Sequence, residues 1–483
     1  MMRAMRIATF PFVMAVSWVV LNCASAQAQF SLPALYADHM VLLADSDITI
    51  KGTDKPGQVV VVDAQWGAKI TATADAAGVW RATLHTSAKA GPWELRFKGS
   101  EERVLRDVLC GEVWLCGGQS NMEWTLGPGV GKGTANYQAE VAAAAHPNIR
   151  LFDVPNVTGA APQATVTGNW ELGDGPQVSK WSAVAWYFAK EVQAATKRPV
   201  GLIVSAWGGT PAESWASAVA LRRHGGFDDT LDALAAADAS KKLGPNTPSA
   251  LWNGMIAPLL PYAIRGAIFY QGESNIGRWE QYRTLFPAMI ADWRAGFGDI
   301  PFLFVQIAPF NYGKDKGEAA RLREAQYFTS ERVANCAMAV TMDIGDAGDI
   351  HPLNKQDVGR RLAAAALVKA YGKEMPWRGP RYMSGEAAGE GTGGEFVLHM
   401  DSGGSALQAR DGLPLTCFSI AGEDRVFHAA VARISGTTLR VSAVAVPSPV
   451  AVRFAFGAAD QPNLRNAAGF PASSFRTDDW PLQ

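Results

Sequence analysis

The sequence predicts an α/β protein in which a parallel central sheet lies between two β-rich regions. Between residues 108 and 371, short apolar runs alternate with amphipathic stretches. This alternation is typical of buried strands and of helices that cover the faces of a parallel sheet. Before and after this region, short runs rich in β-branched and aromatic residues are separated by turn-forming residues. Such spacing is typical of small antiparallel sheets.

Residues 1–28 have the layout of a secretory signal peptide. Arg3 and Arg6 precede an apolar stretch at 7–21, and small residues follow at 24–28. The apolar stretch is shorter than the roughly 20 residues of a membrane-spanning helix. We therefore expect an exported protein, periplasmic or secreted, that starts near residue 29 after cleavage. No later run in the sequence is apolar enough for us to expect a membrane span.

Residues 29–107 are expected to form an N-terminal β-sandwich-like domain, and residues 376–483 a C-terminal β-rich domain. The strands predicted for these two domains lie at 47–51, 58–63, 69–74, 93–97, 395–399, 438–442 and 451–455. Segments rich in Gly and Pro separate the first four of them. We also expect a surface loop at the Gly- and Glu-rich stretch 384–395.

Residues 108–375 are expected to form the catalytic domain. Its buried strands are predicted at 113–116, 201–206, 267–270, 301–307 and 337–342. Helices are predicted at 184–195 and 356–370; Asn354 can cap the second helix, and Gly372 can end it. The loops that follow parallel strands meet at the carboxyl edge of the sheet, where open α/β folds bind ligands.

Ser120 follows the first predicted strand of this domain, within the segment 117–122 (GGQSNM). The two glycines allow a sharp turn that leaves the hydroxyl at the edge of the sheet. A serine hydroxyl is a weak nucleophile and needs a base within hydrogen-bond reach. Taken alone, Ser120 fits equally well as the cap of a following helix.

His351 supplies the missing base from the loop after the last predicted strand. Asp349 lies two residues before it, and a predicted helix follows. An imidazole with a pKa near 6.5 can accept the serine proton at neutral pH and return it to a leaving alcohol. The other six histidines are interpreted as ordinary surface or packing residues.

Two more loops are expected at the same edge. The segment 207–210 (WGGT) has glycines that let a backbone amide approach a ligand closely, as an oxyanion hole requires. The segment 271–275 (QGESN) places several polar side chains after a buried strand, where they need hydrogen-bond partners. Four loops therefore converge on one site, and this favours a nucleophilic role for Ser120.

Composition excludes some partners. The formal net charge of −1 gives no basic footprint for nucleic acid and no polybasic patch for an anionic membrane. No His or Cys spacing suggests zinc, so we expect no metal and no cofactor. Among the cysteines, Cys110 and Cys116 are the pair close enough in sequence for a disulfide to be tested. The oligomeric state is not predicted.

Four segments in this order resemble the conserved blocks of the SGNH hydrolases and, more narrowly, of the sialate O-acetylesterase family of carbohydrate esterases. They are 118–122 (GQSNM), 207–210 (WGGT), 271–275 (QGESN) and 349–352 (DIHP). The resemblance extends to stretches near 32–42, 253–258 and 469–478. It implies a flavodoxin-like three-layer α/β/α catalytic domain with flanking β-rich domains. It also implies a metal-free serine mechanism that removes acetyl groups from sugar hydroxyls.

The resemblance assigns roles by position. Ser120 is expected to be the nucleophile and His351 the general base. The amides of Ser120 and Gly209 are expected to form the oxyanion hole with one side chain from the 271–275 loop, Asn275 or Gln271. SGNH enzymes commonly place the acid three residues before the histidine, and that position here is Gly348.

The acid therefore has three candidates. Asp349, two residues before His351, is favoured because one loop can then hold both groups with few degrees of freedom. Asp346 lies five residues before His351. Glu273 is the third candidate, because in some related carbohydrate esterases the glutamate of the loop that corresponds to 271–275 looks as though it could serve as the catalytic acid.

Four tryptophans near these segments are candidates for stacking on a sugar. Core packing is the favoured interpretation for Trp207 and Trp215, whereas Trp124 and Trp279 are expected to contact substrate. The expected function is a serine esterase that removes O-acetyl groups from a carbohydrate, with O-acetylated sialic acid as the first candidate. The alternatives are an acetylxylan esterase with the same chemistry and an inactive glycan-binding protein.

Overall fold

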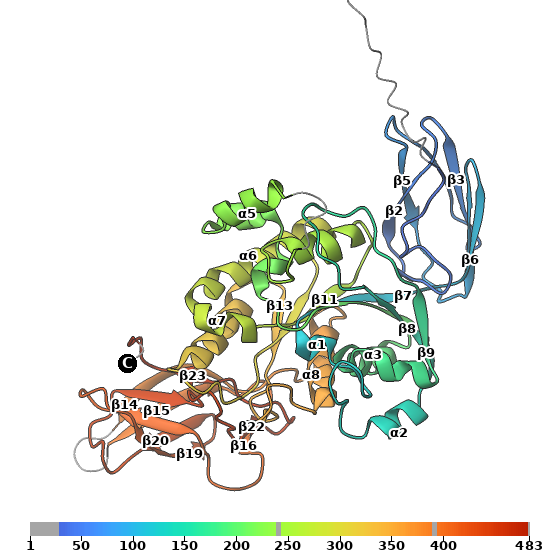
Figure 1. Ribbon diagram of the computed structural model, residues 1–483. Coiled ribbons are helices and arrows are strands. Elements are labelled where there is room, and N and C mark those ends of the chain that lie inside the picture. Colours follow the sequence, from blue (N-terminus) through green and yellow to red (C-terminus); the bar gives the residue numbers. More distant parts are fainter. Residues whose placement is uncertain (1–28, 238–242, 389–393, 482–483) are drawn as a thin grey trace, which may run out of the picture.

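The computed structural model describes residues 29–237, 243–388 and 394–481. The predicted leader at 1–28 lies outside these residues. A β-sandwich near the N-terminus and a β-rich C-terminal part lie at opposite ends of a central α/β region (Figure 1). Within the described ranges, no helix is both long and apolar enough to cross a bilayer.

The N-terminal part consists of two antiparallel sheets. Strand β2 (Asp47–Thr53) pairs with β5 (Val79–His85), and β3 (Val59–Ala64) pairs with both β4 (Lys69–Thr73) and β6 (Trp93–Lys98). Buried and exposed side chains alternate along β2, β3 and β5. Because successive side chains of a strand point to opposite faces, this alternation gives each sheet one apolar face for the shared core.

Strand β7 (Glu102–Gly118) joins the N-terminal part to the central sheet. Its first half pairs with β6, and its last residues lie between two strands of the central sheet. The short strand β1 (Val41–Leu43) pairs with the middle of β7 in parallel. The predicted domain boundary at 107–108 thus falls inside one continuous strand.

The central sheet has the strand order β13-β12-β11-β7-β10-β8-β9. Its strands besides β7 are β8 (Ala145–Asp153), β9 (Trp170–Asp174), β10 (Val200–Ala206), β11 (Gly266–Tyr270), β12 (Phe302–Val305) and β13 (Cys336–Ala339). All are parallel to their neighbours except β9. Later strands lie on both sides of β7, so its carboxyl end faces a crevice of the kind in which α/β folds bind ligands.

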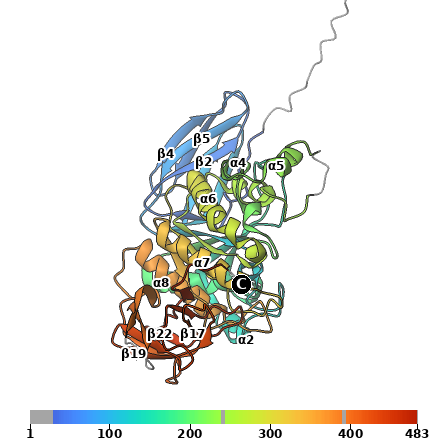
Figure 2. The same cartoon turned by 90° about the vertical axis from the view of Figure 1, so that its left-hand side faces the viewer.

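Helices cover both faces of this sheet. The pair α3 (Ala183–Thr196) and α8 (Lys355–Lys369) packs on one face, and the pair α6 (Trp279–Phe297) and α7 (Glu318–Arg332) packs on the other (Figure 2). Alternate side chains of each central strand enter the two cores, as the period of a strand requires. The predicted three-layer α/β/α arrangement is confirmed.

Shorter elements form the connections. The remaining α-helices are α1 (Ser120–Glu123), α2 (Tyr137–Ala142), α4 (Ala218–His224) and α5 (Asp228–Ala235). Short 3₁₀-helices lie at Pro176–Lys180, Ala212–Trp215, Ala257–Leu259 and Glu273–Arg278, and a π-helical turn lies at Trp252–Ile256.

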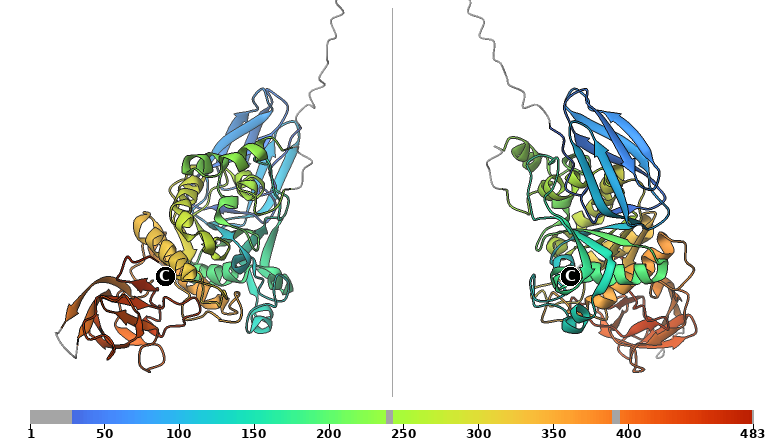
Figure 3. Two further views of the ribbon diagram at one scale, coloured as in Figure 1. Left: turned by 60° about the vertical axis from the view of Figure 1, so that its left-hand side comes forward. Right: turned by 90° about the vertical axis from the view of Figure 1, so that its right-hand side faces the viewer.

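The C-terminal part is built from small antiparallel sheets around its own core (Figure 3). One sheet contains β14 (Arg381–Ala388), β15 (Glu395–Asp401), β20 (Thr438–Ser442) and β19 (Val431–Ser435). The others contain β17 (Phe418–Ala421), β18 (His428–Ala429), β21 (Ala451–Phe454) and β23 (Phe475–Arg476), and the pair β16 (Leu407–Ala409) with β22 (Leu464–Asn466). The surface loop expected at 384–395 is wrong for residues 384–388, which belong to β14, and for Glu395, which begins β15; residues 389–393 lie outside the described part of the chain.

The four cysteines of the described residues are free. Cys110 and Cys116 both lie on β7, where they are buried, and no disulfide joins them. Burial raises the pKa of Cys110 to about 11 and raises that of Cys116 further. Both thiols are therefore protonated core side chains near neutral pH.

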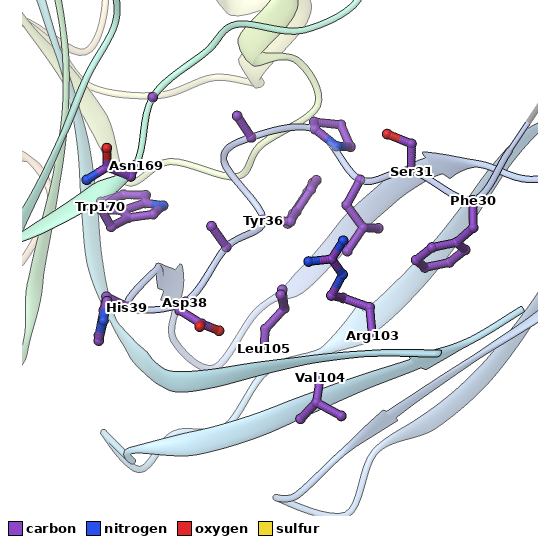
Figure 4. A pocket seen from close by; sticks show the side chains of 15 residues that line it. Phe30, Ser31, Tyr36, Asp38, His39, Arg103, Val104, Leu105, Asn169 and Trp170 are labelled. Carbon is purple, nitrogen blue, oxygen red and sulfur yellow. The ribbon is translucent and has the colours of Figure 1, made fainter. Parts of the chain in front are cut away.

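A cavity of about 570 Å³ lies where the N-terminal sandwich meets the central sheet (Figure 4). Its lining includes Phe30, Tyr36, His39, Arg103 and Trp170. None of the predicted catalytic residues lines it, so this cavity is separate from the site at the carboxyl end of β7.

Candidate active site

Ser120 is the first residue of α1, directly after the end of β7. Its Oγ lies 2.9 Å from Nε2 of His351. The residue in the N-cap position is Gln119, whose side chain makes no capping bond. Ser120 therefore does not cap the helix, and its hydroxyl faces the imidazole instead.

The turn before Ser120 requires glycine at position 118. Gly118 has a φ of 136°, and an added Cβ would lie 2.2 Å from the carbonyl oxygen of Tyr270 on the neighbouring strand β11. A side chain at this position would push the two strands apart. Gly118 thus allows the chain to leave the sheet with Ser120 at its edge.

His351 lies on the loop between β13 and α8. The side chain of Asn354 caps α8 by accepting a hydrogen bond from the amide of Asp357, as predicted. Trp124 stacks on the imidazole, with ring centroids 4.9 Å apart and planes inclined by 22°. The ring of His351 is thereby held with Nε2 toward Ser120.

The ionisation of His351 suits a base. Burial and the charge of Lys355 lower its pKa from the ordinary 6.5, and Asp349 opposes this effect only in part. The imidazole is therefore largely unprotonated at neutral pH, when it has to accept the serine proton.

Asp349 lies beside His351. Its Oδ1 is 3.5 Å from Nδ1 of the imidazole and accepts a hydrogen bond of 2.9 Å from the His351 amide. Lys132 approaches Oδ2 at 3.0 Å. Partial burial opposes ionisation, but the hydrogen bonds from His351 and Lys132 outweigh it and lower the pKa of Asp349.

The two other candidate acids make different contacts. Asp346 accepts a hydrogen bond from the amide of Gly348. Glu273 accepts one from the side chain of Asn121. Within the described part of the chain, neither carboxylate is recorded in contact with His351, so the geometry favours Asp349.

The glycine loop after β10 approaches Ser120. A Cβ added at Gly208 would lie 3.2 Å from the Cβ of Ser120, and the Gly208 amide donates to Oε2 of Glu123 at 2.6 Å. Gly209 has a φ of 74° and is exposed. Among the described residues no acceptor is recorded for the amides of Gly209 and Ser120. Both amides are therefore available to an oxyanion.

The two candidate side-chain donors differ in their hydrogen bonds. Nε2 of Gln271 donates to Oδ1 of Asn275 at 2.6 Å and to the carbonyl of Thr210 at 3.3 Å, which uses both of its hydrogens. Asn275 accepts from the amide of Ala212 and donates one hydrogen to Glu213 at 3.1 Å. One hydrogen of Asn275 remains, so the geometry favours Asn275 and argues against Gln271 as a donor.

Trp124, which was predicted to contact a sugar, is largely buried in the structure. Trp124 is 6% exposed, stacks on His351 and donates from its indole nitrogen to the carbonyl of Gly133. Trp279 is partly buried, and the guanidinium of Arg321 lies 5.4 Å from the centre of its ring. Both tryptophans have protein groups against their faces.

Two members of a polar cluster below Ser120, Asn121 and Lys355, were missed in the sequence. Asn121 lies between Lys355 and Glu273, the third candidate acid, and is hydrogen-bonded to both. Asn121 and Lys355 each lie within a few residues of a predicted site residue, and this proximity was the available signal. Their burial depends on contacts between distant segments and could not be predicted.

Two cavities lie near the carboxyl end of β10. One, of about 290 Å³, includes Glu123, Asp153 and Glu171 in its lining; enclosure and the two glutamates raise the pKa of Asp153 to about 6. The other, of about 610 Å³, includes Gly209 and Arg278. The first cavity is also lined by Lys180, and in the second Arg278 is paired with Glu213.

Comparisons with known proteins agree with this chemistry. Residues 110–368 match the family model described as "Carbohydrate esterase, sialic acid-specific acetylesterase". Human sialate O-acetylesterase is 31% identical over 393 residues, which cover 74% of this chain and 74% of that protein. The mouse enzyme is 30% identical over 420 residues, covering 74% of this chain and 76% of that protein.

A solved structure is similar over almost the full length. It is a carbohydrate acetylesterase from Xanthomonas citri, 39% identical, which covers 93% of this chain and 100% of that chain with a TM-score of 0.84. The similarity therefore includes the β-rich parts as well as the central sheet.

Proposed function

Because this chain belongs to the sialic acid-specific acetylesterase family of carbohydrate esterases, we propose that Ser120, His351 and Asp349 carry out its removal of O-acetyl groups from carbohydrates. The chain is a carboxylic ester hydrolase. The observation that carries the assignment of residues is the 2.9 Å contact between Ser120 Oγ and His351 Nε2.

The first step is acylation. His351 accepts the proton of Ser120 while Oγ attacks the acetyl carbonyl, and Asp349 stabilises the imidazolium that forms. The amides of Ser120 and Gly209 and the side chain of Asn275 donate to the oxyanion, each worth about 10²–10³ in rate. The sugar oxygen then takes the proton from His351 and leaves, so that an acetyl group remains on Ser120.

The second step is deacylation. Water loses a proton to His351 as its oxygen attacks the acetyl carbonyl, and the same donors hold the second oxyanion. The bond to Ser120 Oγ breaks, His351 returns the proton to Oγ, and acetate leaves. No oxidant, metal or cofactor takes part in either step.

O-acetylated sialic acid is the first candidate substrate, since the mammalian relatives are named for it. Arg278 lines the cavity beside Gly209, but it is already paired there with Glu213, so this cavity does not by itself favour an anionic sugar. A neutral acetylated polysaccharide such as acetylxylan is the second candidate. The cavity beside α1 supports it, because its carboxylates can accept hydrogen bonds from sugar hydroxyls but repel an anionic sugar.

A screen of acetate release decides between these candidates. The wild-type protein and Ser120→Ala are incubated with O-acetylated sialic acid, acetylated xylan and a simple acetylated sugar. Release by the wild type and not by the variant supports the proposed mechanism, and the preferred substrate identifies the sugar class. Equal release by both proteins would reject Ser120 as the nucleophile.

We also propose that the enzyme acts outside the cytoplasm. The support is the signal-like composition of residues 1–28. Expression of the full chain followed by fractionation tests this, with a shortened chain recovered from the periplasm or medium as the expected result. Recovery of the full-length chain from the cytoplasm alone would contradict it.

A further inference from the structure

Asn121 joins three segments directly below the nucleophile. It is fully buried, and its Nδ2 donates to Oε1 of Glu273 at 2.8 Å and to the carbonyl of Ile350 at 3.1 Å. Its Oδ1 accepts a hydrogen bond from Nζ of Lys355. Asn121 follows Ser120 in the chain and Ile350 precedes His351, so one side chain links the backbones that carry both reacting groups.

Lys355, the first residue of α8, donates the hydrogen bond that Oδ1 of Asn121 accepts. It is 1% exposed, and its Nζ lies 5.7 Å from the ring centre of Trp124 and 5.6 Å from that of Tyr270. In the described parts of the chain, Oδ1 of Asn121 is the one hydrogen-bond acceptor recorded for its ammonium. Trp124 in turn stacks on His351, so the same indole ring lies near both the ammonium and the imidazole.

A buried ammonium is costly, and packing alone does not require it. Removal of a charge of this kind from water costs several kcal/mol unless partners compensate. Here the partners are one amide oxygen, two aromatic faces and the charge of Glu273. An apolar side chain of similar length, such as methionine, would fill the same space without this cost.

We propose that Lys355 is a positioning residue that fixes Asn121, and through it the alignment of Ser120 with His351, while its charge disfavours protonation of the imidazole. The proposal rests on the proposed function, because it gives Lys355 a task in the same reaction. Lys355 does not touch the acetyl group, so its effect is expected in kcat more than in KM.

The charged groups around His351 determine how readily its imidazole takes up a proton as the pH falls. His351 faces Asp349 on its own loop, Lys132 from the loop after α1, and Lys355 from α8. Burial lowers the pKa of Lys355 to about 7, against the opposing charges of Glu273 and Asp349. Lys355 is therefore most fully charged below neutral pH, where its charge opposes protonation of His351.

The groups on the far side of Lys355 complete the cluster. Burial raises the pKa of Glu273, and its Oε2 is covered without a recorded hydrogen-bond partner in the described residues. Burial also raises the pKa values of Tyr270 and Tyr312, so both phenols stay neutral. Substitution of Lys355 alone would leave the carboxylate of Glu273 uncompensated, and this can weaken the fold.

The test compares Lys355→Met with the double variant Lys355→Met/Glu273→Gln. The double variant removes both buried charges together and keeps an acceptor for Asn121, so it retains the fold if the single variant loses it. Lys369→Met is the matched control, because it makes the same substitution near the other end of α8, roughly 20 Å away. Thermal unfolding checks the fold of each protein.

Two readouts are followed across pH: kcat and KM for an uncharged acetyl ester, and the rate at which a fluorophosphonate labels Ser120. In the folded Lys355 variants, kcat is expected to fall about 10- to 100-fold at little change in KM, as for a misaligned catalytic pair. The acid limb of both profiles is expected to move to higher pH, since His351 binds a proton more readily once the positive charge is gone. Lys369→Met is expected to match the wild type.

The outcomes separate the two proposals. A wild-type protein that neither hydrolyses acetyl esters nor takes the label would reject the proposed function. An active wild type together with a folded Lys355 variant of unchanged kcat and unchanged acid limb would overturn the role of Lys355. A loss of stability with wild-type profiles in the double variant would likewise overturn it, because Lys355 would then act on folding alone.

Discussion

The reactivity of Ser120 depends on whether His351 carries a proton. Burial and Lys355 lower the pKa of His351 below 6.5. As pH falls through this lowered pKa, the imidazole becomes protonated and can no longer accept the serine proton. Activity is therefore lost at pH values below the pKa and reaches its full value at pH values above it. We expect the acid limb of kcat/KM for a neutral acetyl ester, measured from about pH 4 to pH 8, to have its midpoint below 6.5. A midpoint above 6.5 would contradict the arrangement around the imidazole.

Substitutions in the 271–275 loop test which side chain donates a hydrogen bond to the oxyanion. Asn275→Ala is expected to lower kcat about 10²–10³-fold, because it removes an oxyanion donor. Gln271→Ala is expected to cost less, since both hydrogens of the Gln271 amide are used within the protein. Steady-state kinetics of the two variants check this order, and the reverse order would assign the donor to Gln271.

The site residues that could be predicted are those with a reactive side chain in a loop that follows a predicted strand. Ser120 and His351 were predicted because loops after predicted parallel strands meet at one edge of the sheet and because Asp349 lies two residues before His351. Lys355 could not be predicted, because a lysine at the start of a helix is ordinarily solvated, and here Asn121, Trp124 and Tyr270 from distant segments pack around it. The choice between Asn275 and Gln271 depends on partners from a different loop, which the sequence does not place.

At the scale of elements, strands with a continuous apolar run or a clear alternation of apolar and polar residues were predictable, and β8 was not. The predicted strands 201–206 and 267–270 agree within a residue with β10 and β11, because continuous apolar runs are typical of strands covered on both faces. Strand β8 was missed because its first residues are half-buried or exposed and polar. Strand β8 forms its backbone hydrogen bonds with β10 and β9, which come from later parts of the sequence.

The turn between β7 and α1 gives a prediction about stability. Gly118→Ala is expected to lower the free energy of unfolding by at least about 2 kcal/mol, because the residue has a positive φ and the added methyl group meets the backbone of β11. Gly277→Ala is the control, since nothing lies within 4 Å of its added Cβ and its φ is not in the left-handed region. Chemical denaturation measures both, and equal stabilities would contradict the role of Gly118.

At the scale of the whole molecule, single residues join the β-rich parts to the catalytic sheet. Arg150 on β8 is 3% exposed; it donates to the carbonyl of His39 and pairs with Asp107 at 2.8 Å. Arg323 on α7 is fully buried and donates to the carbonyls of Gly457 and Ala458 in the C-terminal part. The parts are thus fixed to one another, although their sequences suggest separate domains.

Arg323 allows a test of this connection. Burial lowers its pKa only to about 10, so the guanidinium stays charged at neutral pH. Arg323→Met leaves buried carbonyls without donors and is expected to lower the free energy of unfolding by about 3 kcal/mol. Arg332→Met, at the exposed end of the same helix, is expected to change it by less than about 0.5 kcal/mol. Equal unfolding temperatures for the two variants would show that the C-terminal part does not depend on Arg323.

The central claim is that Ser120 carries the acetyl group during turnover. The most direct measurement is mass spectrometry of the enzyme quenched with acid while it hydrolyses an acetyl ester. The expected result is one acetyl group on the peptide that contains Ser120, together with loss of both acetylation and hydrolysis in Ser120→Ala. Continued turnover by Ser120→Ala, or an acetyl group found on a different residue, would contradict the account.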